Sequence, residues 1–391
     1  MLVVLLMAAA GAPNGPASVW RVGVLAADTQ VPVVAISSPP SGATVSGVFA
    51  VSGTASDNMA LSVVEVRVDS GSYMTASGTT SWQRSIDSRT YANGAHTITV
   101  RATDSSGNQA SAARTFTFSN GGDLIFPARA AFYYPWFPET WSVNGAHVFY
   151  HPTLGYYDSS GGAVIGAHVR ALDYAKVRVA IASWWGTGTH SESTRLPMLL
   201  DSTAAQGSPL KWALYYEREG QANPTVTELQ ADLSYVKANY AGKPAYARVG
   251  GKPVIFVYNQ NDTTCEVADR WKQASGGQWY VVLKVFSGYR TCANQPDSWH
   301  QYSPAVASDS QSGYSYAISP GFWRADEAAP RLARDLGRWR QNIRDMVASG
   351  APWQLVTTFN EWGEGTAAEI AQEWTTPSGY GDYLDALHDA G

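Results

Sequence analysis

The sequence has 391 residues, of which 45% are hydrophobic, so a sizeable buried core is expected. Its formal net charge is −5 and it contains no block of lysine or arginine, which argues against a nucleic-acid partner. The 15 Trp and 21 Tyr are unusual, because rings with an apolar face and a polar edge suit wet recognition surfaces, although a core built from large residues would use them too.

The first stretch, MLVVLLMAAAGAPNGPASVW, is apolar and then runs into small residues. It is too short to span a bilayer and predicts a secretion signal, so we expect residues 1–30 to be signal peptide and leader. No other stretch of the sequence is long and apolar enough to cross a membrane. We therefore expect a secreted, extracellular bacterial protein. In that oxidising setting Cys265 and Cys292 are expected to form a disulfide, with two free buried thiols as the alternative.

Residues 31–118 consist of short alternating runs rich in Val, Thr and Ser, separated by turn signals such as SSPPSG and DSSGN. This pattern predicts an all-β sandwich similar to the immunoglobulin-like modules of bacterial secreted enzymes, with Trp82 in its core. Calcium at Asp57 or Asp104 is conceivable, but such an acidic run is more often a turn. Residues 119–126 are predicted to be a linker.

From residue 127 to 391, strand-like apolar runs alternate with helical patterns, which predicts a (β/α)8 TIM barrel. Seven continuous apolar runs are typical of strands buried on both faces: 129–136, 176–186, 210–217, 252–259, 279–286, 315–323 and 353–362. An eighth, weaker strand is expected within 298–308. Helices are predicted at 166–175, 225–240, 266–275 and 328–349. An open doubly wound sheet competes, but no glycine-rich nucleotide loop follows the first strand.

Several of these strands end in aromatic, acidic or amide residues, and the active site of such a barrel is built where its strands end. Rings can stack on sugar faces while carboxylates perform acid–base chemistry, so these ends predict a carbohydrate site. The candidate substrate-binding residues are Tyr133, Tyr134, Trp136, Trp184, Trp185, Tyr216, Glu217, Tyr258, Asn259, Trp323, Asn360 and Trp362. Any single Trp among them would more often belong to the core.

The motif TTFNEWGEGTAAE, residues 357–369, carries the candidate catalytic pair Glu361 and Glu364. Glycoside hydrolysis needs two carboxyl groups in different protonation states. Residues three apart in a strand point to opposite faces, so the pair can share a site only if the chain turns between them, and Gly363 and Gly365 permit that turn. Two close carboxylates would also raise the pKa of one of them.

FYYPWF, SWWG, KPVIFVY, SPGFW and above all TTFNEWGEGTAAE resemble the barrels of glycoside hydrolase family 99 and its relatives, which include endo-acting α-mannosidases. The resemblance runs from about residue 127 to the end. It implies a retaining mechanism in which Glu361 deprotonates the sugar 2-hydroxyl and Glu364 protonates the leaving group. The family has His where this chain has Gly363, and the YYEREG segment departs from the family pattern, so the sugar identity stays open.

Two alternatives remain. Asn-Glu at a strand end is also the signature of the large clan A of retaining glycosidases, in which Glu361 would be the acid/base and Glu217 the nucleophile. A non-catalytic carbohydrate-binding or adhesion protein is the other. We expect a polysaccharide or oligosaccharide ligand and a monomer. No cofactor or metal is expected, because the seven His are scattered without ligand-like spacing.

Overall fold

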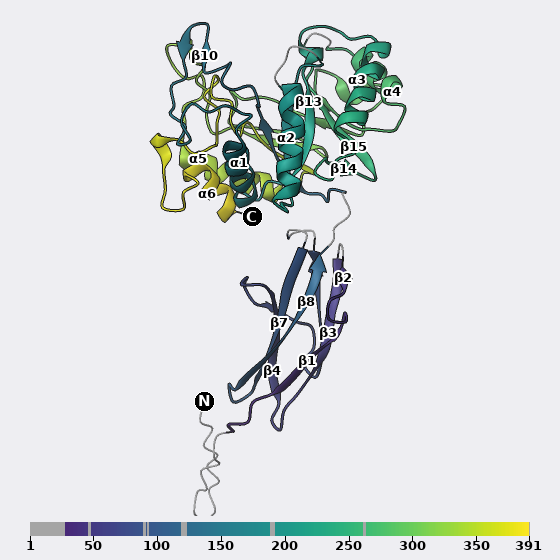
Figure 1. Cartoon of the computed structure of the whole chain (residues 1–391), viewed down its shortest axis with the longest axis vertical. Helices are drawn as coiled ribbons and strands as arrows, with labels where there is room; N and C mark the ends of the chain where they lie inside the picture. The colour runs from purple at the N-terminus through teal and green to yellow at the C-terminus, as the bar shows by residue number, and fades with distance from the viewer. Residues whose placement is uncertain are drawn as a thin grey trace, which may run out of the picture. The chain divides into compact units, whose positions relative to one another are not determined.

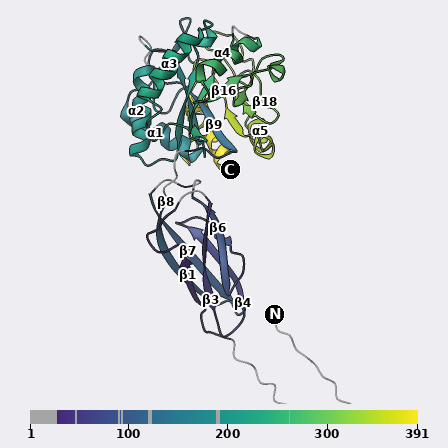
Figure 2. The same cartoon turned by 90° about the vertical axis from the view of Figure 1, so that its right-hand side faces the viewer.

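The computed structural model describes residues 28–45, 48–88, 91, 94–118, 123–187, 192–260 and 263–390. Most of the expected signal peptide and the first half of the expected linker lie outside these residues. None of the helices in the described ranges is both long and apolar enough to cross a bilayer. Figures 1 and 2 show an all-β part and a second part in which helices surround strands.

The strands of residues 33–118 form two sheets. One has the order β1 (Val33–Ser38), β3 (Val48–Ser56) and β6 (Ser81–Asp87). The other has the order β2 (Thr44–Val45), β8 (Gln109–Phe118), β7 (Gly94–Asp104), β4 (Leu61–Val68) and β5 (Met74–Thr75). Every second residue of β4 and β7 is buried, as the alternating pattern predicts.

Trp82 is buried in this part, as expected. An added Cβ at Gly53 would lie 1.9 Å from the carbonyl oxygen of Ala35 and 2.6 Å from the Trp82 ring. The Trp therefore depends on a glycine opposite it.

Eight parallel strands form a nearly closed barrel in the second part. In chain order they are β9 (Ala128–Tyr133), β12 (Val179–Trp184), β13 (Lys211–Tyr216), β15 (Lys252–Val257), β16 (Tyr280–Lys284), β17 (Ser298–His300), β19 (Ser315–Ile318) and β20 (Trp353–Val356). Neighbours in this order pair in parallel, and β20 pairs with β9 to join the last strand to the first. The sheet stays open between β17 and β19, and the extra strand β18 (Ser308–Gln311) pairs antiparallel with β19.

Six helices follow six of these strands in the described residues, and Figure 2 shows α1 to α5 around the outside. They are α1 (Gly162–Tyr174), α2 (Glu192–Ala205), α3 (Val226–Asn239), α4 (Cys265–Ser275), α5 (Leu336–Ala348) and α6 (Asp382–Asp389). After β16 and β17 the described chain forms only the short 3₁₀ turn η3 (Tyr289–Thr291) and β18. The expected ring of eight helices is thus incomplete. Two further two-stranded pairings occur, β10 (Ser142–Val143) with β11 (Ala146–His147), and β14 (Arg248–Val249) with β15.

Local sequence explains where these helices begin. Thr225 accepts the backbone N–H of Glu228, and the Glu228 carboxylate returns to the N–H of Thr225, so α3 begins with a complete capping box. Thr264 caps α4, which ends at Gly276 in the left-handed region at φ +54°.

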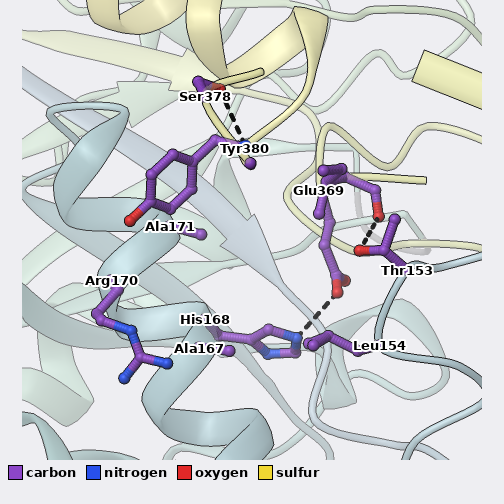
Figure 3. A pocket seen from close by; sticks show the side chains of 11 residues that line it. Thr153, Leu154, Ala167, His168, Arg170, Ala171, Glu369, Ser378 and Tyr380 are labelled. Atoms are coloured by element: carbon purple, nitrogen blue, oxygen red, sulfur yellow. Dashed lines mark hydrogen bonds and ion pairs between the residues drawn. The ribbon is translucent and has the colours of Figure 1, made fainter. Parts of the chain in front are cut away.

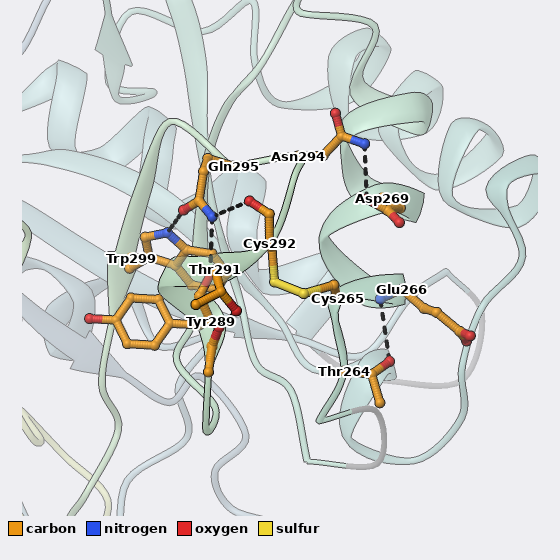
Figure 4. The surroundings of a disulfide bond; sticks show 11 residues. Thr264, Cys265, Glu266, Asp269, Tyr289, Thr291, Cys292, Asn294, Gln295 and Trp299 are labelled. Carbon is orange, nitrogen blue, oxygen red and sulfur yellow. Dashed lines mark hydrogen bonds between the residues drawn. A yellow bond between two sulfur atoms is a disulfide. The ribbon is translucent and has the colours of Figure 1, made fainter.

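The expected disulfide joins Cys265, the first residue of α4, to Cys292 just after η3 (Figure 4). Helix α4 thus begins one residue before the helix that the sequence predicts at 266–275. Gln295 holds the Cys292 side of this link, because its amide donates to the carbonyls of Tyr289 and Cys292.

Candidate active site

The barrel strands bury two different faces. Towards the axis lies a cluster that includes Phe132, Tyr134, Tyr215, Val282 and Leu355, with Tyr258 and Tyr302 packed against it. Towards the helices lies a second cluster that includes Tyr133, Trp184 and Tyr216. Because successive side chains of a strand point to opposite faces, neighbours in the sequence fall into different clusters.

Glu361 and Glu364 lie on one turn that follows β20. The backbone N–H of Glu364 donates to Glu361 Oε1 at 3.3 Å, so the turn brings the second residue back onto the first carboxylate. The hydroxyl of Thr358 accepts the N–H of Glu361 at 2.8 Å and contacts the hydroxyl of Thr366 at 3.0 Å. The N–H of Thr366 in turn donates to the Glu361 carbonyl, which closes the turn.

Both glycines of this turn are needed, for different reasons. Gly365 has φ +64°, and an added Cβ there would lie 2.6 Å from the carbonyl oxygen of Trp323. An added Cβ at Gly363 would lie 3.0 Å from Glu361 Oε1 and 3.0 Å from Val143. Gly363 thus leaves space beside the Glu361 carboxylate.

Three carboxyl groups influence one another here. Burial raises the pKa of Glu361 well above its ordinary value, and the charge of Glu364 raises it further. Burial also raises the pKa of Glu364 to about 7. The pKa of Glu217 rises to about 8 through burial, with added repulsion from Glu192 and Glu364.

Polar atoms without partners accompany these carboxyls. Among the described residues, the buried atoms Glu361 Oε2, Glu217 Oε1 and Trp136 Nε1 have no hydrogen-bond partner. The Ser183 hydroxyl lies near enough to lower the pKa of Glu217, but it has no well-oriented bond either. Buried polar groups in folded proteins are almost always paired. Orphaned indole nitrogens also occur in the core, at Trp82 and Trp184, so it is the grouping of such atoms with carboxyls of raised pKa that points to a place where a ligand binds.

Tyrosines surround the pair. Tyr134 donates to the hydroxyl of Tyr302 at 2.8 Å, and Tyr302 donates to Glu364 Oε2 at 3.4 Å. Trp136 stacks on Tyr134 with ring centroids 4.4 Å apart. Trp323 donates its backbone N–H to the carbonyl of Glu364, so the chain after β19 is tied to the same turn.

Five candidates are positioned by the framework in ways that the sequence did not predict. Asn360 accepts the backbone N–H of Tyr134 and donates to its carbonyl, so its amide ties β20 to β9. Trp362 is buried and donates to the hydroxyl of Tyr157 and to Glu369. Tyr133 binds His168 of α1, and Tyr216 binds Asp232 of α3. Trp184 is fully buried beneath the helices.

These five positions are therefore corrections to the expected sugar contacts. Three of them lie at a strand end with the side chain towards the helices: Tyr133, Trp184 and Tyr216. Because side chains alternate along a strand, it is the neighbouring residues whose side chains point towards the barrel axis. Asn360 and Trp362 use their polar groups within the protein. Tyr134, Trp136, Glu217, Tyr258 and Trp323 remain near the carboxyl pair. Trp185 is half-buried directly after β12, and Asn259 is buried beside Tyr258.

A hydrogen-bonded chain behind the turn reaches a pocket on the outer side of the barrel. His168 Nε2 lies 3.0 Å from Glu369 Oε1, and Glu369 Oε2 accepts the hydroxyl of Tyr157 at 2.7 Å. His168 and Glu369 line a pocket of about 300 Å³ together with Leu154, Arg170 and Tyr380 (Figure 3). Neither Glu361 nor Glu364 lines it, so this pocket is separate from the cluster of three carboxylates described above.

Sequence reasoning missed Lys284 and Tyr302. Lys284 ends β16 in phase with the axis-facing Val282, and that phase could have identified it. Tyr302 follows the three-residue strand β17, which is too short to show a phase.

Metal-ligand groups come together elsewhere in the described residues. Single carboxylate oxygens of Asp28, Asp57 and Asp104 lie within 4.8 Å of one another in the all-β part. Asp104 already accepts the N–H groups of Ser106 and Asn108, which is the turn that the sequence suggested. This acidic group lies in the all-β part of the chain, whereas Glu361 and Glu364 lie on the barrel.

Two family models match the chain. Residues 32–100 match the bacterial Ig domain, and residues 131–289 match glycosyl hydrolase family 99. The second match ends before Glu361, so it does not include the carboxyl pair.

Known proteins show the same relationship. A glycoprotein endo-alpha-1,2-mannosidase of Xenopus laevis is 22% identical over 282 residues, which is 60% of this chain and 61% of that protein. A family 99 endo-alpha-mannosidase structure from Bacteroides thetaiotaomicron aligns with a TM-score of 0.52 at 19% identity, over 68% of this chain and 96% of that one. A glycoside hydrolase-like protein aligns with a TM-score of 0.51 at 16% identity, over 67% of this chain and 93% of that one.

The chain therefore spans about three-fifths of the length of the mannosidase relative. At these identities the structural likeness concerns the fold, and the family models carry the assignment. The resemblance expected from the sequence is confirmed: residues 32–100 match the bacterial Ig domain, and residues 131–289 match glycosyl hydrolase family 99.

Proposed function

We propose that the protein is a secreted, retaining and endo-acting glycoside hydrolase that cleaves an α-linked, mannan-like polysaccharide. We further propose that its second domain is a (β/α)8 barrel that has lost two of its helices. The family match supports glycosidase chemistry, and the endo-alpha-mannosidase names of the relatives support the linkage. Secretion is supported by the apolar start of the sequence and by the disulfide between Cys265 and Cys292.

The observation that carries the proposal is the environment of Glu361. Burial and the charge of Glu364 raise the pKa of Glu361, and the backbone N–H that its Oε1 accepts lowers this pKa by a smaller amount. Its Oε2 is buried without a partner among the described residues. A substrate hydroxyl that donates to Oε2 would satisfy this orphaned acceptor and could pass its proton to it. Glu364, with a pKa raised to about 7, keeps a proton near neutral pH and can donate it.

The resemblance implies the following sequence of bonds. Glu361 takes the proton of the sugar 2-hydroxyl as that oxygen attacks the anomeric carbon. The bond to the leaving oxygen breaks, and the oxygen receives the proton of Glu364. Water, deprotonated by Glu364, then opens the three-membered ring at the anomeric carbon, and Glu361 returns its proton to the 2-oxygen. Two inversions give overall retention.

A panel of α-mannans, α-glucans and mixed bacterial polysaccharides, assayed for released reducing ends, tests the proposal. Glu364→Gln should lower turnover of unactivated glycans by about 10²- to 10⁴-fold with affinity retained, because only the proton donor is lost. Substrates with good leaving groups should recover part of the rate. Glycan binding by the wild-type protein without any release of reducing ends would instead favour a carbohydrate-binding or adhesion protein.

A clan A mechanism is the second candidate, because Glu217 lies close enough to Glu361 for its charge to raise the pKa of Glu361. Glu217 would then be the nucleophile and Glu361 the acid/base. Burial raises the pKa of Glu217 to about 8 and also raises that of Glu361, so the pKa shifts favour neither mechanism over the other. A fluorosugar that labels Glu217 would support clan A, and failure of labelling with turnover intact would support the 2-hydroxyl route.

A further inference from the structure

Lys284 is a cation on the axis side of the barrel and is not among the site residues that the sequence predicts. It ends β16, and strand alternation places it on the same face as Val282 of the inner cluster. Its ammonium donates to the carbonyl of Asn259 at 3.2 Å and lies 4.4 Å from the centre of the Tyr258 ring. The side chain is half-buried, and loss of solvent lowers its pKa to about 8, so it is still mostly protonated at neutral pH.

The surroundings of Lys284 connect it to the candidate catalytic carboxyls. Burial raises the pKa of Tyr258, the ring over which the ammonium lies, and the charges of Glu217 and Glu364 raise it further. The charge of Lys284 also contributes to the lowered pKa of His300, whose ring packs near Phe132 and Phe256 of the inner cluster. Lys284 therefore contacts a ring, Tyr258, that lies next to the proposed reaction centre.

No carboxylate within ion-pair distance of Lys284 appears in the described part of the chain. By contrast, Arg324 and Arg331, the cations that act on Glu364, are paired with Asp326 and Glu327. A buried ammonium is costly unless an anion compensates it, and a carbonyl and a ring face supply only part of that compensation. Neutral sugar hydroxyls would add hydrogen bonds without adding opposite charge.

We propose that Lys284 binds an anionic group on a sugar of the substrate, so that the polysaccharide cleaved here is acidic. This inference rests on the proposed hydrolase function and names its substrate class. A carboxylate of a uronic acid and a phosphate or sulfate ester share the required chemistry, since each offers oxygens to the remaining N–H donors of the ammonium.

Calorimetric binding to the full-length protein with matched glycans tests this. One pair consists of uronate-containing α-linked oligosaccharides and the same oligosaccharides after reduction of their carboxyl groups. The second consists of phosphorylated α-mannan oligosaccharides and their dephosphorylated forms. We expect at least one charged form to bind tenfold or more tightly than its neutral counterpart, and the pair that shows this identifies the anion.

Variants assign the preference to the lysine. Lys284→Met should remove the preference, whereas Lys284→Arg should keep much of it, and Lys284→Gln replaces Lys284→Met if the latter is insoluble. Lys211→Met is the matched control, because Lys211 is also half-buried and its ammonium also donates to a carbonyl, but at the amino end of β13. Its preference should equal that of the wild type.

Equal affinity for charged and neutral forms, no binding of any charged form, or a preference that survives Lys284→Met would each overturn the proposal. Assay of reducing ends on the same glycans separates this from the hydrolase function. Cleavage without any charge preference would reject the anion site and keep the hydrolase. Charge-selective binding that depends on Lys284, without cleavage, would keep the anion site and reject the hydrolase.

Discussion

Tyr216 and Glu217 are neighbours in the chain, yet they meet opposite environments. The hydroxyl of Tyr216 points to the helix layer and donates to Asp232 of α3 at 2.6 Å. Glu217 lies on the axis side, buried, with one carboxylate oxygen that has no partner among the described residues. Tyr133 and Tyr134 divide in the same way, the first bound to His168 and the second joined through Tyr302 to Glu364.

The difference separates residues that hold the barrel together from residues that are available to a ligand. The hydroxyls of the outer tyrosines Tyr133 and Tyr216 form hydrogen bonds with helix residues, and these bonds stabilise the folded protein. On the inner side, carboxyls are buried with raised pKa values and incomplete hydrogen bonding, which costs stability and is typical of functional sites. Substitutions on the two faces should therefore affect different measurements.

The largest effect on stability should come from Trp184 on the outer face. It is fully buried, so Trp184→Ala should lower the free energy of unfolding by about 3–5 kcal/mol, through lost burial and the cavity that remains. Denaturant titration measures this. The neighbouring Trp185→Ala is the control and should destabilise far less, because Trp185 is half-exposed. A stable Trp184→Ala protein that has lost glycan affinity would place Trp184 in the site and break the comparison.

On the inner face, Glu217 should make stability depend on pH. Its pKa is raised from 4.5 to about 8 on folding, so between these values the folded protein binds more protons than the unfolded chain. Stability contributed by this group is present below pH 4.5 and is lost as the pH rises towards 8, with a slope of up to about 1.4 kcal/mol per pH unit.

Glu217→Gln should therefore flatten the fall in stability across this range, measured by denaturant titration at several pH values. The Tyr216→Phe variant serves as the control and should keep the wild-type slope. An unchanged slope in Glu217→Gln would mean that this carboxyl is ionised in the folded protein and that its burial is compensated.

The disulfide should affect stability and leave the chemistry intact. Cys265 and Cys292 close a loop with a sequence separation of 27, so opening it should cost about 3.5 kcal/mol in the loop-entropy account. The double variant Cys265→Ser/Cys292→Ser, compared with the wild type in thermal unfolding, gives the value. Turnover at a temperature where both are folded should be equal, and a selective loss of turnover would contradict the separation of roles.

Much of the barrel could be predicted, since all seven apolar runs became strands and the four predicted helices exist. Helix α2 was missed because Pro197 interrupts its pattern, and α6 because it has only eight residues. The alternation of side chains along a strand could also have predicted that Tyr133 and Tyr134 point to opposite faces and that Lys284 points towards the axis. This alternation can be read from the residues of the strand itself. Tyr302 and the Glu369–Tyr157–Trp362 contacts could not be found this way, because they depend on how segments far apart in sequence meet.

The smallest effect should distinguish two tyrosine hydroxyls, one on each face. The hydrogen bond from Tyr302 lowers the pKa of Glu364, which burial otherwise raises to about 7. Tyr302→Phe removes this bond, so the pKa of Glu364 should rise and the alkaline limb of kcat/KM should move to higher pH. At 3.4 Å the bond is long, so the displacement should be small. Tyr216→Phe should instead cost about 1 kcal/mol of stability and leave the limb in place. If Tyr302→Phe leaves the limb unmoved while Tyr216→Phe displaces it, Glu364 is not the group that must be protonated.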